Sequence, residues 1–171
     1  ENIFSRSTKT LDQLNLNILD ARIITSTNGY TLDTYIVMEE NGEKINGSQR
    51  KKDITSILQK NLSNNDKQTK INSRFNSRKI KNFPIPTQII FTQDEINNRT
   101  ILEVTASDRP GFLSAIGSAL DNFQTQVHGA KIATYGERIE DIFFITNKYS
   151  KQIRDEEYCQ SLRDAIYNEI M

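Results

Sequence analysis

The residue types that could do chemistry gather in one short segment, Asp108-Arg109-Pro110-Gly111-Phe112-Leu113. It separates an apolar run from a helical pattern, so free backbone N–H groups lie at a helix start, where the helix dipole favours an anion. Gly111 lets a ligand approach the backbone closely, and Asp108 could hold an ammonium group. An α-amino acid carries both charges side by side, so the segment matches such a ligand. An ordinary helix N-terminus with Pro110 in its first turn is the alternative.

The other reactive side chains do not form a catalytic set. Glu140 and Asp141 are neighbours on an expected strand, so they point to opposite faces, and edge solvation or a turn contact is their expected role. His128 is the only histidine, and we expect it to be a partly buried structural residue on the same face as Ala130. We expect Cys159 to contribute to helix packing. The chain carries no phosphate loop, dinucleotide fingerprint or nucleophile elbow, so we expect no catalysis, metal or cofactor in it.

The elements that must position the segment come from a repeat within the chain. Residues Asn17–Thr25 return as Gln126–Thr134, 109 residues later. Solenoid repeats have periods of about 20–50 residues, so this longer period indicates two copies of one small domain. By the same offset Glu1 corresponds to Pro110, so we expect the first domain to lack its leading strand.

Each copy is predicted to run strand, helix, strand, strand, helix, which is typical of a ferredoxin-like α+β fold. In copy two the strands are expected at residues 101–106, 127–135 and 139–146, with one helix after Pro110 and another over Tyr158–Ile170. No strand is expected after that last helix, so Thr87–Thr92 is the candidate fourth strand, antiparallel to Ile101–Ala106. The predicted order of the second domain is therefore ββαββα.

The chain is divided into a truncated first domain at residues 1–62, a basic polar linker at 63–86 and a second domain at 87–171. The linker could be a patch for an anionic partner or a solvated connection, and its lack of interleaved aromatic residues favours the connection. The whole chain carries 22 basic and 22 acidic residues, which favours neither nucleic acid nor a membrane as a partner. No apolar stretch reaches the roughly 18–20 residues of a membrane span, and the single cysteine favours a reducing cytoplasm.

A resemblance adds to this interpretation. The Asp108–Leu113 segment, followed by Ala130–Phe143, is similar to ACT domains, which sense amino acids. More narrowly, it resembles the second of the tandem ACT domains that end the bacterial bifunctional uridylyltransferase and uridylyl-removing enzymes. The runs Leu16–Ile23 and Asn82–Thr87 also match what precedes that second domain, so the resemblance covers nearly the whole chain.

That family modifies the nitrogen-regulatory PII protein, and the resemblance implies that this chain is its C-terminal glutamine sensor. It also implies a nucleotidyltransferase with magnesium elsewhere in the parent enzyme. In ACT pairs an effector binds between the strand-to-helix loop of one domain and the start of the second strand in its partner. The loop Asp108–Leu113 would thus face Asn17 and Ile18. A reciprocal site would pair Gln126 and Val127 with the equivalent loop of the first copy, which we expect this chain to lack, so that site would be incomplete.

Two other functions remain open from the sequence. A constitutive dimerisation or docking module of the same fold would bind no small molecule, and an amino-acid sensor from another ACT-bearing protein would prefer a different amino acid. We also expect the apolar strand Leu32–Met38 to lack a neighbour. Such an edge should recruit a strand from another copy of the chain, so we expect a homo-oligomer.

Overall fold

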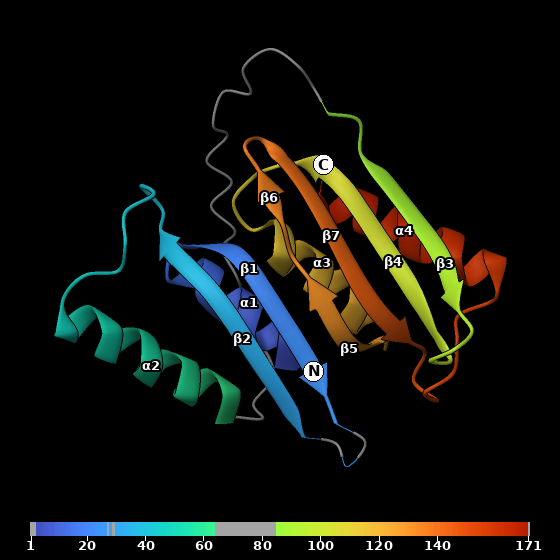
Figure 1. Ribbon diagram of the computed structural model, residues 1–171, viewed down its shortest axis with the longest axis horizontal. Helices are drawn as coiled ribbons and strands as arrows, with labels where there is room; N and C mark the ends of the chain where they lie inside the picture. The colour runs from blue at the N-terminus through green and yellow to red at the C-terminus, as the bar shows by residue number, and fades with distance from the viewer. Residues whose placement is uncertain (1–2, 27, 29, 64–84, 171) are drawn as a thin grey trace.

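The computed structural model describes residues 3–26, 28, 30–63 and 85–170 (Figure 1). In chain order the elements are α1 (Ile3–Gln13), β1 (Leu16–Thr25), β2 (Thr31–Glu39), α2 (Ser48–Ser63), β3 (Gln88–Asp94), β4 (Arg99–Ser107), α3 (Phe112–Asn122), β5 (Gln126–Lys131), β6 (Thr134–Tyr135), β7 (Arg138–Thr146) and α4 (Glu156–Ile170). The predicted basic linker lies almost wholly outside the described residues. None of the described helices is long and apolar enough to cross a membrane.

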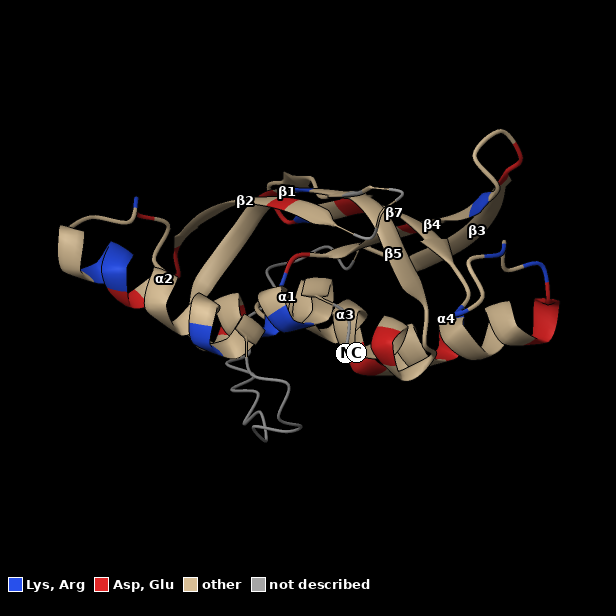
Figure 2. Ribbon diagram, turned by 90° about the horizontal axis from the view of Figure 1, so that it is seen from below, with Lys and Arg blue, Asp and Glu red and all other residues tan. Residues whose placement is uncertain are grey.

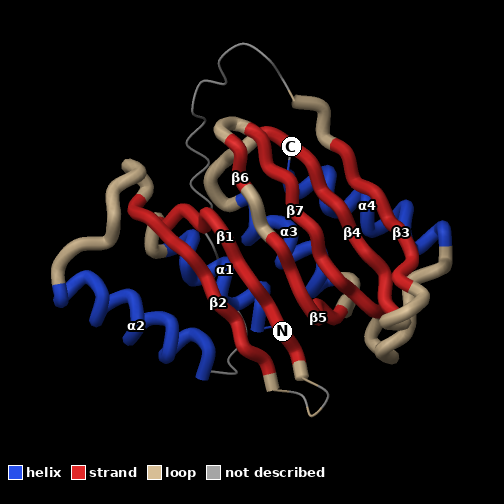
Figure 3. The backbone as a smooth tube through the Cα atoms, viewed as in Figure 1, coloured by secondary structure: helices blue, strands red, loops and turns tan. Residues whose placement is uncertain are grey.

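The strands form one antiparallel sheet with the order β2-β1-β5-β7-β4-β3, and the short β6 pairs with β7. The helices lie on one side of this sheet and leave its other face open (Figure 2). Strands from both copies of the repeat lie side by side in the same sheet (Figure 3). The protein is therefore a two-layer α+β fold, which confirms the predicted class.

The second copy has its fourth strand at the front, as predicted. β3 pairs antiparallel with β4, with Ile90 opposite Glu103. β4 also pairs with β7, and β7 pairs with β5, which gives the local order β5-β7-β4-β3. The helices α3 and α4 pack on this half and bury Ile116 and Leu162 completely. This strand order is ferredoxin-like, so the ββαββα prediction is confirmed.

One predicted strand is interrupted. The strand expected at residues 127–135 divides into β5 and β6, because Ile132 and Ala133 leave the sheet between them. The N–H of Ala133 instead donates to carboxylate Oδ1 of Asp141 at 3.2 Å, and its carbonyl accepts the N–H of Glu140 at 2.9 Å. A side chain thus replaces one backbone partner of this segment, and the prediction of a single strand is wrong here.

The internal repeat extends to the irregularities of the sheet. β1 has a bulge between Ile18 and Asp20 where it pairs with β2, and β5 has one between Val127 and Gly129 where it pairs with β7. These positions are equivalent under the 109-residue offset. The copies meet where β1 pairs antiparallel with β5, through Arg22 and Lys131, which are themselves equivalent. The two copies are therefore related by an approximate two-fold axis at that pair.

Gly129 departs from the repeat because β1 approaches it closely. A Cβ built at Gly129 would lie 3.1 Å from the carbonyl oxygen of Ile23 and 3.1 Å from Cδ2 of Phe144. Its counterpart Asp20 is exposed and meets no such restriction. The sequence difference between the copies at this position thus reflects the contact between them.

The larger of two hydrophobic clusters joins the two copies. α1 packs against α3, where a Cβ built at Gly117 would lie only 3.1 Å from Cα of Ser5. Phe4 of α1 is 1% exposed, and its ring meets the ring of Phe143 in β7 edge-on with the centroids 5.7 Å apart. Because side chains of both copies fill this core, the end of α1 is held beside the loop between β4 and α3.

β2 forms one edge of the described sheet, as predicted for Leu32–Met38. On the open face Leu32 and Ile36 are 67% and 53% exposed. Arg50 of α2 joins this edge through two bonds to the Glu39 carboxylate, at 2.9 and 2.8 Å. An edge of this kind offers backbone groups to another strand, and the assembly that would use it stays a prediction.

Candidate functional site

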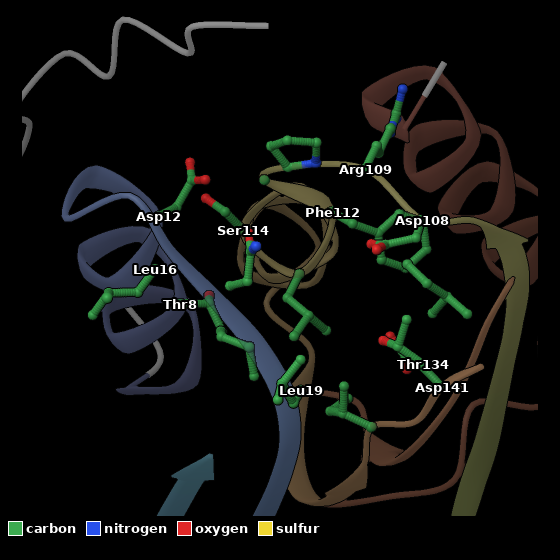
Figure 4. A pocket seen from close by; sticks show the side chains of 17 residues that line it. Thr8, Asp12, Leu16, Leu19, Asp108, Arg109, Phe112, Ser114, Thr134 and Asp141 are labelled. Carbon is green, nitrogen blue, oxygen red and sulfur yellow. The ribbon is translucent and has the colours of Figure 1, made fainter. Parts of the chain in front are cut away.

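A small cavity of about 100 Å³ opens between the two copies, at the loop that joins β4 to α3 (Figure 4). The structure brings together here eight of the residues that the sequence singled out: Asn17, Ile18, Asp108, Arg109, Pro110, Gly111, Phe112 and Leu113. Residues not foreseen complete the lining: Thr8, Asp12, Leu16, Leu19, Ser114, Ile132, Thr134, Ile139 and Asp141. The volume suits a small metabolite better than a nucleotide, since pockets for drug-sized ligands measure about 300–1,000 Å³.

The start of α3 supplies backbone donors to this cavity. Gly111 caps the helix in the left-handed region, with φ of 76°, and no side chain of the cap bonds to the helix. Phe112 N makes only a long bond of 3.4 Å to the carbonyl of Arg109. The next amides, of Leu113 and Ser114, have no partner within the helix because they belong to its first turn. The geometry suits an anion such as a carboxylate.

Asp141 is the functional candidate that the sequence interpretation missed. Its side chain lies on the helix side of β7 and is 1% exposed, so the predicted edge solvation is wrong for this residue. Its Oδ1 instead accepts the N–H of Ala133, in the segment between β5 and β6. The second oxygen, Oδ2, is buried without a hydrogen-bond partner. The pKa of Asp141 is raised to about 8, mainly because the carboxyl is buried. The hydrogen bond from the N–H of Ala133 opposes this rise, and the charge of Asp108 adds to it.

Asp12 adds a carboxylate from the other copy. A Cβ built at Gly111 would lie 3.4 Å from each carboxylate oxygen of Asp12, so this side chain borders the α3 N-terminus. Burial raises the pKa of Asp12 above its ordinary value. The guanidinium of Arg109 points elsewhere, to the carbonyl of Glu169 at 3.3 Å. The cavity therefore combines backbone donors with the carboxylates of Asp12, Asp108 and Asp141, and can hold a molecule with both charges.

Asn17 and Ile18 enter the cavity from the start of β1. The side-chain nitrogen of Asn17 donates to the carbonyl of Glu40 at 3.4 Å, a long bond that a ligand could replace. Ile18 is half-buried and contributes apolar surface. The start of this strand and the loop of the second copy therefore line the same cavity, and their shared role in binding a ligand stays a prediction.

The structure does not bring Gln126 and Val127 to this cavity. Val127 is in the shared core. The side chain of Gln126 donates to the carbonyl of Lys148 at 3.4 Å and accepts from the hydroxyl of Ser150 at 3.1 Å. The reciprocal site predicted for these two residues stays a prediction.

Histidine and cysteine take structural positions. His128 is the extra residue of the β5 bulge, and its Nε2 bonds the hydroxyl of Thr146 at 2.7 Å on the open face. The bulge separates it from Ala130, which lies in the core, so the predicted shared face is wrong. Cys159 is buried, with its thiol 3.8 Å from the carbonyl of Ile153. Within the described part of the chain, no group of three or more His, Cys, Asp and Glu side chains could hold a metal ion.

Comparison with known proteins gives a consistent result. Over 168 residues, 98% of this chain, it is 43% identical to the bifunctional uridylyltransferase/uridylyl-removing enzyme of Stutzerimonas stutzeri (strain A1501). It is 42% identical over the same length to the enzymes of the same name from Pseudomonas fluorescens (strain Pf-5) and Pseudomonas fluorescens (strain SBW25). The chain spans 19% of the length of these relatives. The predicted resemblance to the bifunctional uridylyltransferase/uridylyl-removing enzymes is therefore confirmed, and it concerns one segment of those enzymes. No family model and no solved structure matches the chain.

Proposed function

We propose that this chain, which matches a segment of the bifunctional uridylyltransferase/uridylyl-removing enzymes, is a regulatory module that senses glutamine. The observation that carries the proposal is the cavity between the two copies, which combines a helix start that no capping side chain bonds with a buried, unsatisfied carboxyl group. These are complementary to the two charges of an α-amino acid. The similarity of the chain to ACT domains supports the same class of ligand.

The arrangement suggests how the ligand lies. Its carboxylate accepts bonds from the first amides of α3, after Gly111. Its ammonium group lies toward the carboxylates of Asp108 and Asp141, and its side chain reaches Asn17, whose amide can donate to and accept from the amide of glutamine. Little room is left for a larger ligand in a cavity of about 100 Å³.

Regulation follows from the position of the cavity rather than from chemistry within it. One wall comes from α1 and β1 of the first copy, and the other from the β4–α3 loop of the second. A ligand that contacts both walls stabilises one relative placement of the copies over others, and a regulatory effect requires such a difference. In the full-length protein this difference would bias the transfer and removal of uridylyl groups on the PII protein.

The chemistry itself belongs to other parts of the parent enzyme in this proposal, and so does its magnesium. The PII protein would interact with this chain only through that parent enzyme. The exposed edge at β2 would pair with a second copy of the chain.

A docking module without a ligand is the second candidate function, and one observation favours it. The β2 edge carries Leu32 and Ile36 in exposed positions, and α2 beside it has Ile54 as its only buried residue among those described. Such an edge could serve assembly alone. A sensor for another amino acid is the third candidate and would use the same cavity.

An amino-acid screen by thermal unfolding separates these functions. Glutamine should raise the melting temperature in proportion to the logarithm of its concentration, because it binds the folded state alone. Gly111→Val should abolish the rise, since a side chain there meets Asp12 and occupies the approach to the helix. Gly42→Val is the matched control, because Gly42 has a φ of 83° and open space around it. A greater rise with another amino acid supports the third candidate, and no rise with any supports docking.

A further inference from the structure

The fold buries Asp141 without satisfying it. Oδ1 accepts the N–H of Ala133, whereas Oδ2 is buried and has no hydrogen-bond partner. A buried polar atom without a partner costs free energy, which an apolar residue such as Leu at this position would avoid. The side chain lines the cavity, so a ligand in the cavity can supply the missing partner.

We propose that Asp141 receives the ammonium group of the bound amino acid. This assignment rests on the proposed function and names the residue that makes the cavity specific for an amino group. Figure 4 shows Asp108 and Asp141 on the side of the cavity away from Asp12, with the start of α3 between them and Asp12. A ligand whose carboxylate lies at the helix start therefore directs its ammonium group toward these two residues.

Burial distinguishes Asp141 from Asp108 as the principal partner. Asp108 is exposed, and an ion pair in water contributes little to binding. Asp141 is 1% exposed, so its attraction to a cation is screened far less. The exposed carboxylate would guide the ammonium group inward, and the buried one would hold it.

The groups around Asp141 determine its protonation in the empty cavity. The loop before α3 presents the carboxylate of Asp108, and α1 presents that of Asp12 at the helix start. The cation of Arg109 is directed to a carbonyl of α4, and Arg138 pairs with Glu140 at 2.6 Å on the opposite face of β7. The remaining segments that line the cavity, β1, α3, β6 and Ile132 before it, contribute apolar or neutral side chains there.

These surroundings link binding to proton release. With the pKa of Asp141 raised to about 8, its carboxyl is protonated in the empty cavity at neutral pH. An ammonium group beside it favours the ionised form, so the carboxyl loses its proton when the ligand binds. The affinity should therefore rise with pH by up to about tenfold per unit below pH 8 and then level off.

Calorimetry of the whole chain with glutamine, in buffers of different ionisation enthalpy, measures this directly. At pH 6.5 we expect the release of about one proton for each glutamine bound. The result needs no variant and does not depend on whether a substitution is tolerated. Binding of glutamine without proton release would overturn the inference and leave the proposed function standing, whereas no binding of any amino acid would overturn both.

Two variants identify the residue. Asp141→Asn keeps the shape of the side chain, so the variant should fold. Its affinity for glutamine should be roughly 10–100-fold lower than that of the wild type, and binding should release no proton. Glu140→Gln is the matched control on the opposite face of the same strand, and it should behave as the wild type. If Asp108→Asn removes the proton release and Asp141→Asn does not, Asp108 holds the ammonium group and the assignment is wrong.

A ligand variant tests the same contact from the other side. Glutaramic acid is glutamine without its α-amino group, so it cannot use Asp141. We expect it to bind the wild type and Asp141→Asn equally and to release no proton. A loss of affinity for glutaramic acid in Asp141→Asn equal to the loss for glutamine would show that the substitution acts on the cavity in general, and would overturn the assignment.

Discussion

Replacing Asp141 with Asn should change the stability of the ligand-free protein in opposite directions at low and neutral pH. The carboxyl has an ordinary pKa of about 3.9 in the unfolded chain and about 8 in the folded protein. The folded state thus holds the proton more tightly than the unfolded state. The free energy of unfolding falls as pH rises from about 4 to about 8, where the folded protein also loses the proton.

The size of the effect follows from this interval. The contribution of Asp141 to the free energy of unfolding falls by about 1.4 kcal/mol for each pH unit above about pH 4. At pH 7 the resulting loss of stability is therefore at most about 4 kcal/mol. Asn does not ionise and escapes it, but it buries an NH₂ group without an acceptor, which costs about 1–3 kcal/mol. Asp141→Asn should therefore be more stable than the wild type by about 1–3 kcal/mol at pH 7, and less stable by a similar amount near pH 4.

Urea unfolding at pH 4, 5, 6 and 7 provides the assay. Glu140→Gln is the control, because it shows how the loss of an exposed carboxylate changes stability over the same pH range. The difference between Asp141→Asn and the wild type should change by about 4 kcal/mol across this range, and the control difference should stay much smaller. A difference that is the same at pH 4 and pH 7 would refute the reasoning. It would mean that Asp141 is ionised in the folded protein at neutral pH.

Three further substitutions test the packing that forms the cavity, each by urea unfolding. Gly117→Ala should cost about 1–3 kcal/mol, because the added Cβ would lie 3.1 Å from Cα of Ser5 and force α1 away from α3. Gly129→Ala should cost a similar amount, because the Cβ meets the carbonyl of Ile23 in the neighbouring strand. Phe4→Ala should cost about 3–5 kcal/mol by emptying the core that both copies share. A loss of less than about 0.5 kcal/mol in any of them would contradict the corresponding contact.

The sequence predicted the architecture because the signals for it are local or repeated. The 109-residue repeat gave two copies, and the β-prone runs around residues 87–92 and 101–106 gave the hairpin that places the fourth strand first. The loop Asp108–Leu113 was predicted for a similar reason, since a proline and a glycine mark a helix start directly. Its position beside Asn17 came from the family resemblance.

What the sequence did not reveal depends on irregular backbone and on contacts between distant segments. A bulge of one residue reverses the alternation rule, so His128 was assigned to the wrong face. Asp141 could have been found, because it alternates with the buried Ile139 and Phe143, although an acidic residue there looks exposed by composition. Asp12 reaches the cavity only because α1 packs against α3, which no local pattern shows.

Titration of the chain with glutamine, compared with Asn17→Ala, tests the central claim that the ligand lies between the two copies. The account predicts saturable binding to the wild type and an affinity lower by about 1–3 kcal/mol in the variant, because a buried group of the ligand loses its partner on the first copy. Equal affinity in the two proteins would contradict a site shared by both copies. It would confine any binding to the second copy alone.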